Sequence, residues 1–133
     1  MFIVNLTQYP ASAEQRAVGV VDLQDGHLDD LIEALTFGEL PDANEIRMRA
    51  DFIAGLAVMN GLGDDLCDSP DVNAAMISGP PWLMAPLAAA LIARWIKPLF
   101  AFSVCDTEEQ TEADGSIRKV TIFRHTGFVS AIV

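Results

Sequence analysis

The chain has 133 residues, of which 51% are hydrophobic, and its formal net charge is −11. This length suits a single domain with a core of its own. The strongly negative charge argues against general binding to duplex DNA or to anionic membranes. The acidic surplus lies in residues 1–93, which carry fourteen acids and three bases, whereas residues 94–133 carry five of each. An anion is therefore best tolerated near the C-terminal third.

The sequence favours a location in the cytoplasm. Cys67 and Cys105 belong to no paired motif, which fits a reducing compartment. No basic segment precedes the apolar N-terminal run, as a secretory signal would require. Residues 74–93 are uncharged and long enough to span a membrane, but glycine and prolines interrupt them. We therefore expect a cytoplasmic protein that does not bind membranes, and the apolar excess favours a homodimer.

The chain opens with a strand and a short helix. Residues 2–6 form an apolar run of the kind found in central strands. Ser12 and Gln15 have the spacing of a capping box, so a short helix is expected to end at Gly19. Residues 20–23 that follow are expected to be extended.

Two longer helices come next. Residues 27–36 have apolar side chains at helical spacing on one face. Residues 43–60 follow an Asp42–Glu45 pair, which is typical of a helix N-terminus. Residues 64–71 are acidic but lack the ligand spacing of a calcium loop, so we interpret them as a solvated loop.

Residues 74–104 predict a strand, a crossover helix and a second strand. The strands are expected at 74–78 and 99–104, and the helix at 83–95. Such a unit is typical of parallel strands. Because the helix is apolar almost all round, we expect it to be covered on most sides.

The C-terminal third predicts a hairpin. Residues 106–116 are polar and contain the turn signal Asp114-Gly115. Residues 117–124 predict a strand antiparallel to 99–104, and residues 128–133 form an apolar tail, either an edge strand or an oligomer contact. Residues 1–133 therefore predict one α/β domain with a small three-layer, Rossmann-like sheet, mostly parallel, with an antiparallel C-terminal strand.

A ligand site is expected outside the carboxyl ends of the parallel strands, where open α/β sheets bind their ligands. Two of these loops precede helices, whose free backbone N–H groups favour an anion. Trp82 can stack on a base. The alternative interpretation is that these are ordinary turn, cap and core residues. The predicted ligand-binding residues are Thr7, Gln8, Tyr9, Ser12, Ser78, Gly79 and Trp82.

The candidate catalytic residues are Arg124 and His125, at the end of the last strand. Such a pair can neutralise a phosphate or take part in acid–base chemistry. The alternative is an exposed pair without a function. With two histidines far apart and two unclustered cysteines, we expect no metal site and no cofactor. Neither a phosphate-binding glycine motif nor a nucleophile motif is present.

Several segments resemble small bacterial proteins of unknown function that are carried on mobile elements. These segments are NLTQYPASAEQ (5–15), VVDL (20–23), LTFGELP (35–41), GPPWLMAPL (79–87), PLFAFS (98–103) and RKVTIFRHTGFV (118–129). Tyr9 stands where that family shows histidine. The first strand with its Thr-Gln turn and the later strand–helix–strand unit are also similar to small CRISPR-associated, Rossmann-like proteins, among them ring nucleases. The latter resemblance implies binding of cyclic oligoadenylate at the dimer interface of such sheets.

Two functions of different class follow. The first is binding of a small anionic nucleotide, such as a cyclic oligoadenylate, with or without metal-independent cleavage by a ring-nuclease-like phosphodiesterase mechanism. The second is a non-catalytic, acidic interaction protein that meets a protein partner or mimics nucleic acid. A concave pocket at the strand ends favours the first function, and a flat acidic edge favours the second.

Overall fold

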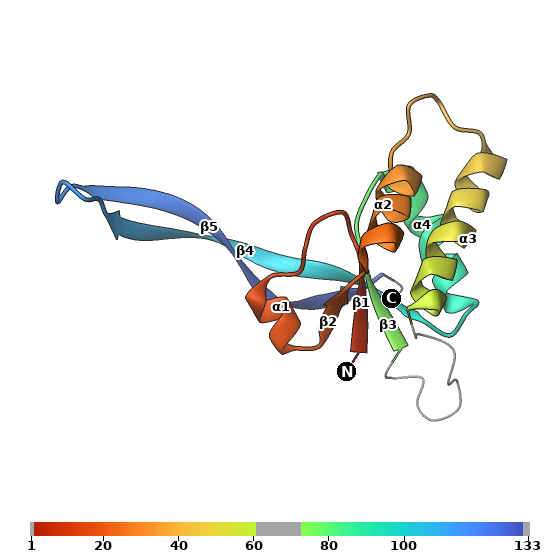
Figure 1. Ribbon diagram of the computed structural model, residues 1–133, viewed down its shortest axis with the longest axis horizontal. Helices are drawn as coiled ribbons and strands as arrows, with labels where there is room; N and C mark the ends of the chain where they lie inside the picture. Colours follow the sequence, from red (N-terminus) through yellow and green to blue (C-terminus); the bar gives the residue numbers. More distant parts are fainter. Residues whose placement is uncertain (1, 61–72, 132–133) are drawn as a thin grey trace.

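The computed structural model describes residues 2–60 and 73–131, and it forms a five-stranded sheet with helices on both faces (Figure 1). The acidic segment 64–71 and Cys67 lie outside the described residues. The elements in chain order are β1 (Phe2–Leu6), α1 (Ala13–Ala17), β2 (Val20–Asp22), α2 (Asp25–Leu35), α3 (Ala43–Met59), β3 (Asn73–Ile77), α4 (Pro81–Ile92), β4 (Lys97–Thr111) and β5 (Ile117–Ser130).

The strand order is β2-β1-β3-β4-β5, with the first four strands parallel and β5 antiparallel to β4. The predicted fold class is therefore confirmed, and residues 20–22 add a fifth strand beside β1. The chain passes from β1 to β2 on one side and then returns to β3 on the other side of β1. Such a reversal leaves a crevice at the carboxyl ends of the two central strands, where doubly wound sheets bind ligands.

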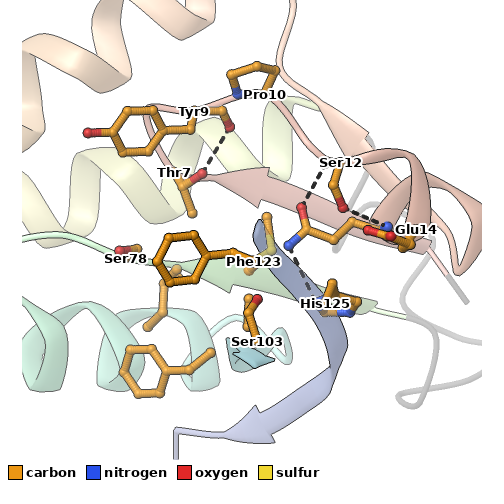
Figure 2. Close-up of a pocket in the computed structure, with 14 residues that line it drawn as sticks. Thr7, Tyr9, Pro10, Ser12, Glu14, Ser78, Ser103, Phe123 and His125 are labelled. Atoms are coloured by element: carbon orange, nitrogen blue, oxygen red, sulfur yellow. Dashed lines mark hydrogen bonds between the residues drawn. The ribbon is translucent and has the colours of Figure 1, made fainter. Parts of the chain in front are cut away.

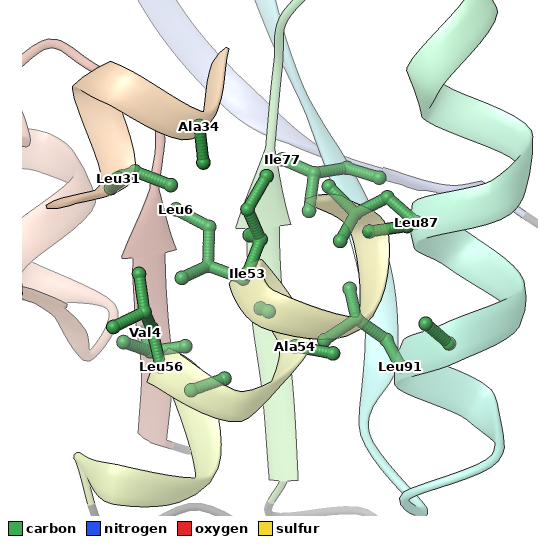
Figure 3. Packing of buried hydrophobic residues seen from close by; sticks show 14 of the residues in the cluster. Val4, Leu6, Leu31, Ala34, Ile53, Ala54, Leu56, Ile77, Leu87 and Leu91 are labelled. Carbon is green, nitrogen blue, oxygen red and sulfur yellow. The ribbon is translucent and has the colours of Figure 1, made fainter. Parts of the chain in front are cut away.

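Helices α2, α3 and α4 cover one face of the sheet and enclose the main core (Figure 3). Val4 and Leu6 of β1 and Ile77 of β3 point into this core and are at most 1% exposed. The opposite face is smaller and is covered near α1. Ile3, Met76 and Leu99 lie there against Ala11 and Phe128.

The predicted starts of α1 and α3 agree with the structure because their caps form. The Ser12 side chain accepts a hydrogen bond from the Gln15 N–H, and Gln15 Oε1 accepts one from the Ser12 N–H, which completes the capping box. Asp42 Oδ1 accepts a hydrogen bond from the Glu45 N–H at 2.8 Å. These bonds satisfy donors that a helix N-terminus otherwise leaves free.

The apolar helix is covered on most sides, as expected, but one stripe of it is exposed. Helix α4 ends at Ile92, earlier than predicted, and its outer face is open: Trp82 is 50% and Ile92 42% exposed. Trp95, 72% exposed, has a φ of 61°. It occupies the left-handed position after the helix that glycine favours, and the Ile96 N–H closes the turn on the Leu91 carbonyl.

The hairpin is confirmed, but both of its strands are longer than predicted. Strand β4 continues to Thr111, and only residues 112–116 turn, with Gly115 at a φ of 88°. Strand β5 runs without a break into the predicted apolar tail, where Phe128 packs on the smaller core. The two strands form a long arm that projects from the body (Figure 1). The extension of β4 past residue 104 was missed because residues 105–111 are exposed and mostly polar, without the apolar alternation of a half-buried strand.

Among the described residues, no helix is long and apolar enough to cross a membrane.

Candidate functional site

A pocket of about 620 Å³ opens at the carboxyl ends of β1, β3 and the parallel part of β4 (Figure 2). It therefore lies at the β1/β3 reversal of strand order. The base of the arm closes one side with Phe123 and His125. The volume falls within the range of roughly 300–1,000 Å³ typical of small-molecule sites. The lining residues are Thr7, Tyr9, Pro10, Ser12, Glu14, Gln15, Met76, Ile77, Ser78, Phe100, Ala101, Ser103, Phe123 and His125.

The shape of the first pocket loop depends on Asn5, a buried amide in the middle of β1. Its Nδ2 donates to the Tyr9 carbonyl and to Asp22 Oδ1, both at 2.8 Å. Its Oδ1 accepts from the Thr7 N–H at 2.9 Å and from the Thr7 hydroxyl at 2.6 Å. One side chain thus uses all its hydrogen-bonding capacity. These bonds fold residues 7–9 back over the strand end.

Asp22, at the end of β2, ties the same loop to the sheet. It accepts hydrogen bonds from Asn5 and from the Ala11 N–H, and it pairs with Arg16 at 3.0 Å. Burial raises the pKa of the Asp22 carboxyl, but these hydrogen bonds and the Arg16 charge outweigh burial, so the pKa lies below the ordinary 3.8. The ionised form therefore stabilises the pocket loop.

A chain of hydrogen-bonding contacts favours one tautomer of His125. The Ser12 N–H donates to Gln15 Oε1, which orients the amide so that Gln15 Nε2 faces His125 Nδ1 at 3.5 Å. Because the amide nitrogen donates, Nδ1 accepts, and the proton of a neutral ring lies on Nε2. His125 Nε2 is buried and has no hydrogen-bond partner in the described structure. A buried donor without a partner is costly, and a ligand can supply the missing acceptor.

The rest of the pocket offers rings and hydroxyls. Tyr9 is 70% and Phe123 77% exposed, so both rings have a free face. Ser78 and Ser103 are exposed, and no described residue hydrogen-bonds to either hydroxyl. His125 is held from behind by Phe128, with ring centroids 4.8 Å apart. The pocket can therefore hold a ligand with a flat ring and several hydrogen-bonding groups.

The pocket brings together five of the nine predicted site residues: Thr7, Tyr9, Ser12, Ser78 and His125. Gln8 is exposed on the same loop but does not line the pocket. Gly79 faces the other way, because a side chain there would meet Leu35 at 3.0 Å. Trp82 lies on the helical face of the sheet, edge-on to Phe37 with centroids 5.7 Å apart.

Arg124 is separated from His125 by the alternation of a strand. Successive side chains point to opposite faces, and Arg124 lies opposite Val104 and 3.6 Å from Asp106. The structure therefore does not form the expected Arg–His pair in the pocket.

The expectation that free backbone N–H groups before the helices favour an anion does not hold at the start of α4. Helix α4 begins with Pro80 as N-cap and Pro81 after it, and neither residue has an N–H to offer an anion. Of the described residues that line the pocket, Glu14 is the one Asp, Glu, Lys or Arg. As it stands in one copy, the pocket suits a ligand's ring and sugar-like hydroxyls better than a cluster of phosphates.

Among the contributors that the sequence interpretation missed are Asn5, Gln15, Ser103 and Phe123. Asn5 interrupts an apolar strand, which is a signal for a buried, hydrogen-bonded amide. Gln15 is recognisable only as a capping residue. Ser103 and Phe123 give no signal, because their approach depends on the pairing of β4 with β5 and on a bulge between Phe102 and Ser103. Within the described ranges no cluster of His, Cys, Asp and Glu has the arrangement of a metal site.

The sequence model of the uncharacterized protein MJ1673 family matches residues 1–129. Because the match covers nearly the whole chain, the chain belongs to this family. None of the curated proteins and none of the solved structures compared with the chain gives a significant match.

Proposed function

We propose that the protein binds a small nucleotide, such as one unit of a cyclic oligoadenylate, in the pocket at the β1/β3 strand ends. The observation that carries this proposal is His125 Nε2, a buried and oriented nitrogen without a partner in the pocket wall. A nucleotide offers acceptors for this N–H, a flat base for Tyr9 or Phe123, and hydroxyls for Ser78 and Ser103.

The shape of the strand-end edge favours this function over a flat interaction surface. An interaction protein with an acidic face needs no concavity, whereas a ligand site does. The pocket also lies where doubly wound sheets bind ligands. Its position, its volume of about 620 Å³ and the oriented imidazole support the same function independently.

If the ligand is an RNA-type phosphodiester, cleavage needs no nucleophile from the protein. The ribose 2′-oxygen can attack the adjacent phosphorus when it is held in line. The O2′–P bond forms and the P–O5′ bond breaks, while water takes the 2′ proton and supplies one to the 5′-oxygen. The His125 Nε2–H stabilises the charge on the phosphate oxygens. Such a reaction leaves 2′,3′-cyclic phosphate ends and is unaffected by EDTA.

The test is a thermal-shift screen with cyclic oligoadenylates, linear oligoadenylates, dinucleotides and mononucleotides. A ligand at about 100 times its Kd stabilises the folded state by roughly 2.7 kcal/mol. If no nucleotide raises the melting temperature, the proposal is wrong.

Calorimetry with two neighbouring variants then locates the site. His125→Ala removes one hydrogen bond to the ligand, of about 0.5–1.5 kcal/mol, so Kd rises roughly 2- to 13-fold. Arg124→Ala is on the opposite face of the same strand and leaves Kd within about twofold, since surface changes away from a site have small effects. Equal losses in both variants would contradict the placement of the ligand.

A further inference from the structure

The arm has an open edge. Strand β4 pairs with β3 only over Lys97–Leu99, so beyond this point β4 and β5 form a two-stranded ribbon. Figure 1 shows this ribbon extending away from the body. No other described strand pairs with the outer edge of β5. A two-stranded ribbon is only marginally stable in water, and its unpaired backbone groups favour the addition of a further strand.

The two strands of the arm carry charges of opposite sign. In the arm, β4 carries Asp106, Glu108 and Glu109 without a base, whereas β5 carries Arg118, Lys119 and Arg124 without an acid. Like charges directly opposite each other destabilise a sheet. Two antiparallel β4 edges centred on any residue from 106 to 109 set acids opposite acids. Two β5 edges have registers that avoid this conflict.

One of these β5 registers has its centre at Ile122. It sets Arg118 opposite Thr126 and Val120 opposite Arg124, so no like charges meet. It also sets Lys119 opposite His125 of the other copy. Lys119 shares a face of β5 with Phe123 and His125, because side chains two apart lie on the same face. This face is the one that lines the pocket.

We propose that two copies of the chain pair through the β5 edges of their arms, antiparallel and two-fold symmetric about Ile122. The result is a four-stranded sheet in the order β4-β5-β5-β4, which is a closed, self-complementary contact. The Lys119 ammonium of each copy then lies at the rim of the other copy's pocket. The role of Lys119 rests on the proposed function, because it supplies a cation for a nucleotide phosphate that the pocket of one copy lacks.

The pairing is tested first without any ligand. Light scattering of the full chain at micromolar concentration should give twice the mass of 14.4 kDa. Ile122→Cys, in a background with Cys67→Ser and Cys105→Ser, should form an intermolecular disulfide on mild oxidation, because two residues on the axis face each other. The matched control keeps exposed Cys105 and carries only Cys67→Ser. Cys105 is on the outer strand of the proposed sheet and should not cross-link.

A monomer mass would overturn the pairing, and so would cross-linking of Cys105 in place of position 122. Both outcomes leave the proposed function standing, because it is judged by nucleotide binding to the natural chain. Conversely, failure of every nucleotide to bind removes the role of Lys119 and leaves the arm contact to be judged by mass and cross-linking.

The shared site is tested by mixing two defective variants. Lys119→Ala and His125→Ala should each weaken nucleotide binding when alone. In a mixed dimer, the Lys119→Ala copy keeps an intact pocket and receives Lys119 from the His125→Ala copy. Random exchange at equal amounts makes half of the dimers mixed, so about a quarter of all sites should regain the natural Kd. No recovery in a mixture shown to contain mixed dimers would overturn the shared site.

Discussion

Asn5→Ala is expected to be the most informative single change in the body of the protein. The substitution removes four hydrogen bonds of 2.6–2.9 Å that hold the loop after β1. A net hydrogen bond contributes about 0.5–1.5 kcal/mol, and bonds sharing one side chain do not add fully, so we expect a loss of about 2–4 kcal/mol. This is a large part of the roughly 5–15 kcal/mol that stabilises a domain.

Urea denaturation followed by far-UV circular dichroism measures this loss. With a slope of about 2 kcal/mol per molar urea, in the middle of the usual range, the midpoint should fall by roughly 1–2 M. The matched control is Gln8→Ala, an exposed neighbour outside the hydrogen-bond network, with an expected change of at most about 0.5 kcal/mol. If Asn5→Ala lowers the free energy of unfolding by less than about 1 kcal/mol, the view that this amide holds the pocket loop in place is refuted, because four hydrogen bonds should contribute more.

Three further outcomes are expected. Folding lowers the pKa of Asp22, so its contribution to stability is complete above the ordinary value of 3.8 and is lost as the pH falls below that value. Asp22→Asn should therefore flatten the acid end of a curve of stability against pH. Trp95→Gly should raise the free energy of unfolding by about 1 kcal/mol, since glycine adopts the left-handed conformation without the cost of a Cβ, and an unchanged or lower value in the same urea assay would contradict this. Ile77→Asp, at a site 1% exposed in the main core, should leave no soluble folded protein on expression.

The body of the fold could be predicted because its signals are local. Apolar runs predicted β1 and β3, helical spacing predicted α2, and the Asp42 cap predicted the start of α3. The sheet type followed from the crossover unit at 74–104. These features depend on residues close together in the chain, and burial reinforces each of them.

The length of the arm and part of the site could not be predicted, because they depend on pairing between distant segments. Exposed strands carry charges on both faces, so residues 106–111 show no alternation that separates strand from loop. Whether Arg124 or His125 faces the pocket depends on the register with β4, which a bulge shifts. From the position of the strand ends alone, the sequence placed the candidate site at the sheet edge where the pocket opens.

Nuclear magnetic resonance of the histidine ring nitrogens tests the central claim most directly. The chain has two histidines, and His27 is bonded to Asn60 at a contact of 3.1 Å, away from the pocket, so it serves as an internal reference. In the free protein, the long-range 15N–1H spectrum should show the Nε2–H tautomer of His125. Titration with a nucleotide that raises the melting temperature in the thermal-shift screen should change the chemical shift of His125 Nε2 and leave those of both His27 nitrogens unchanged. A nucleotide that binds with no change at His125 Nε2 would contradict the claim that this nitrogen is the anchor of the site.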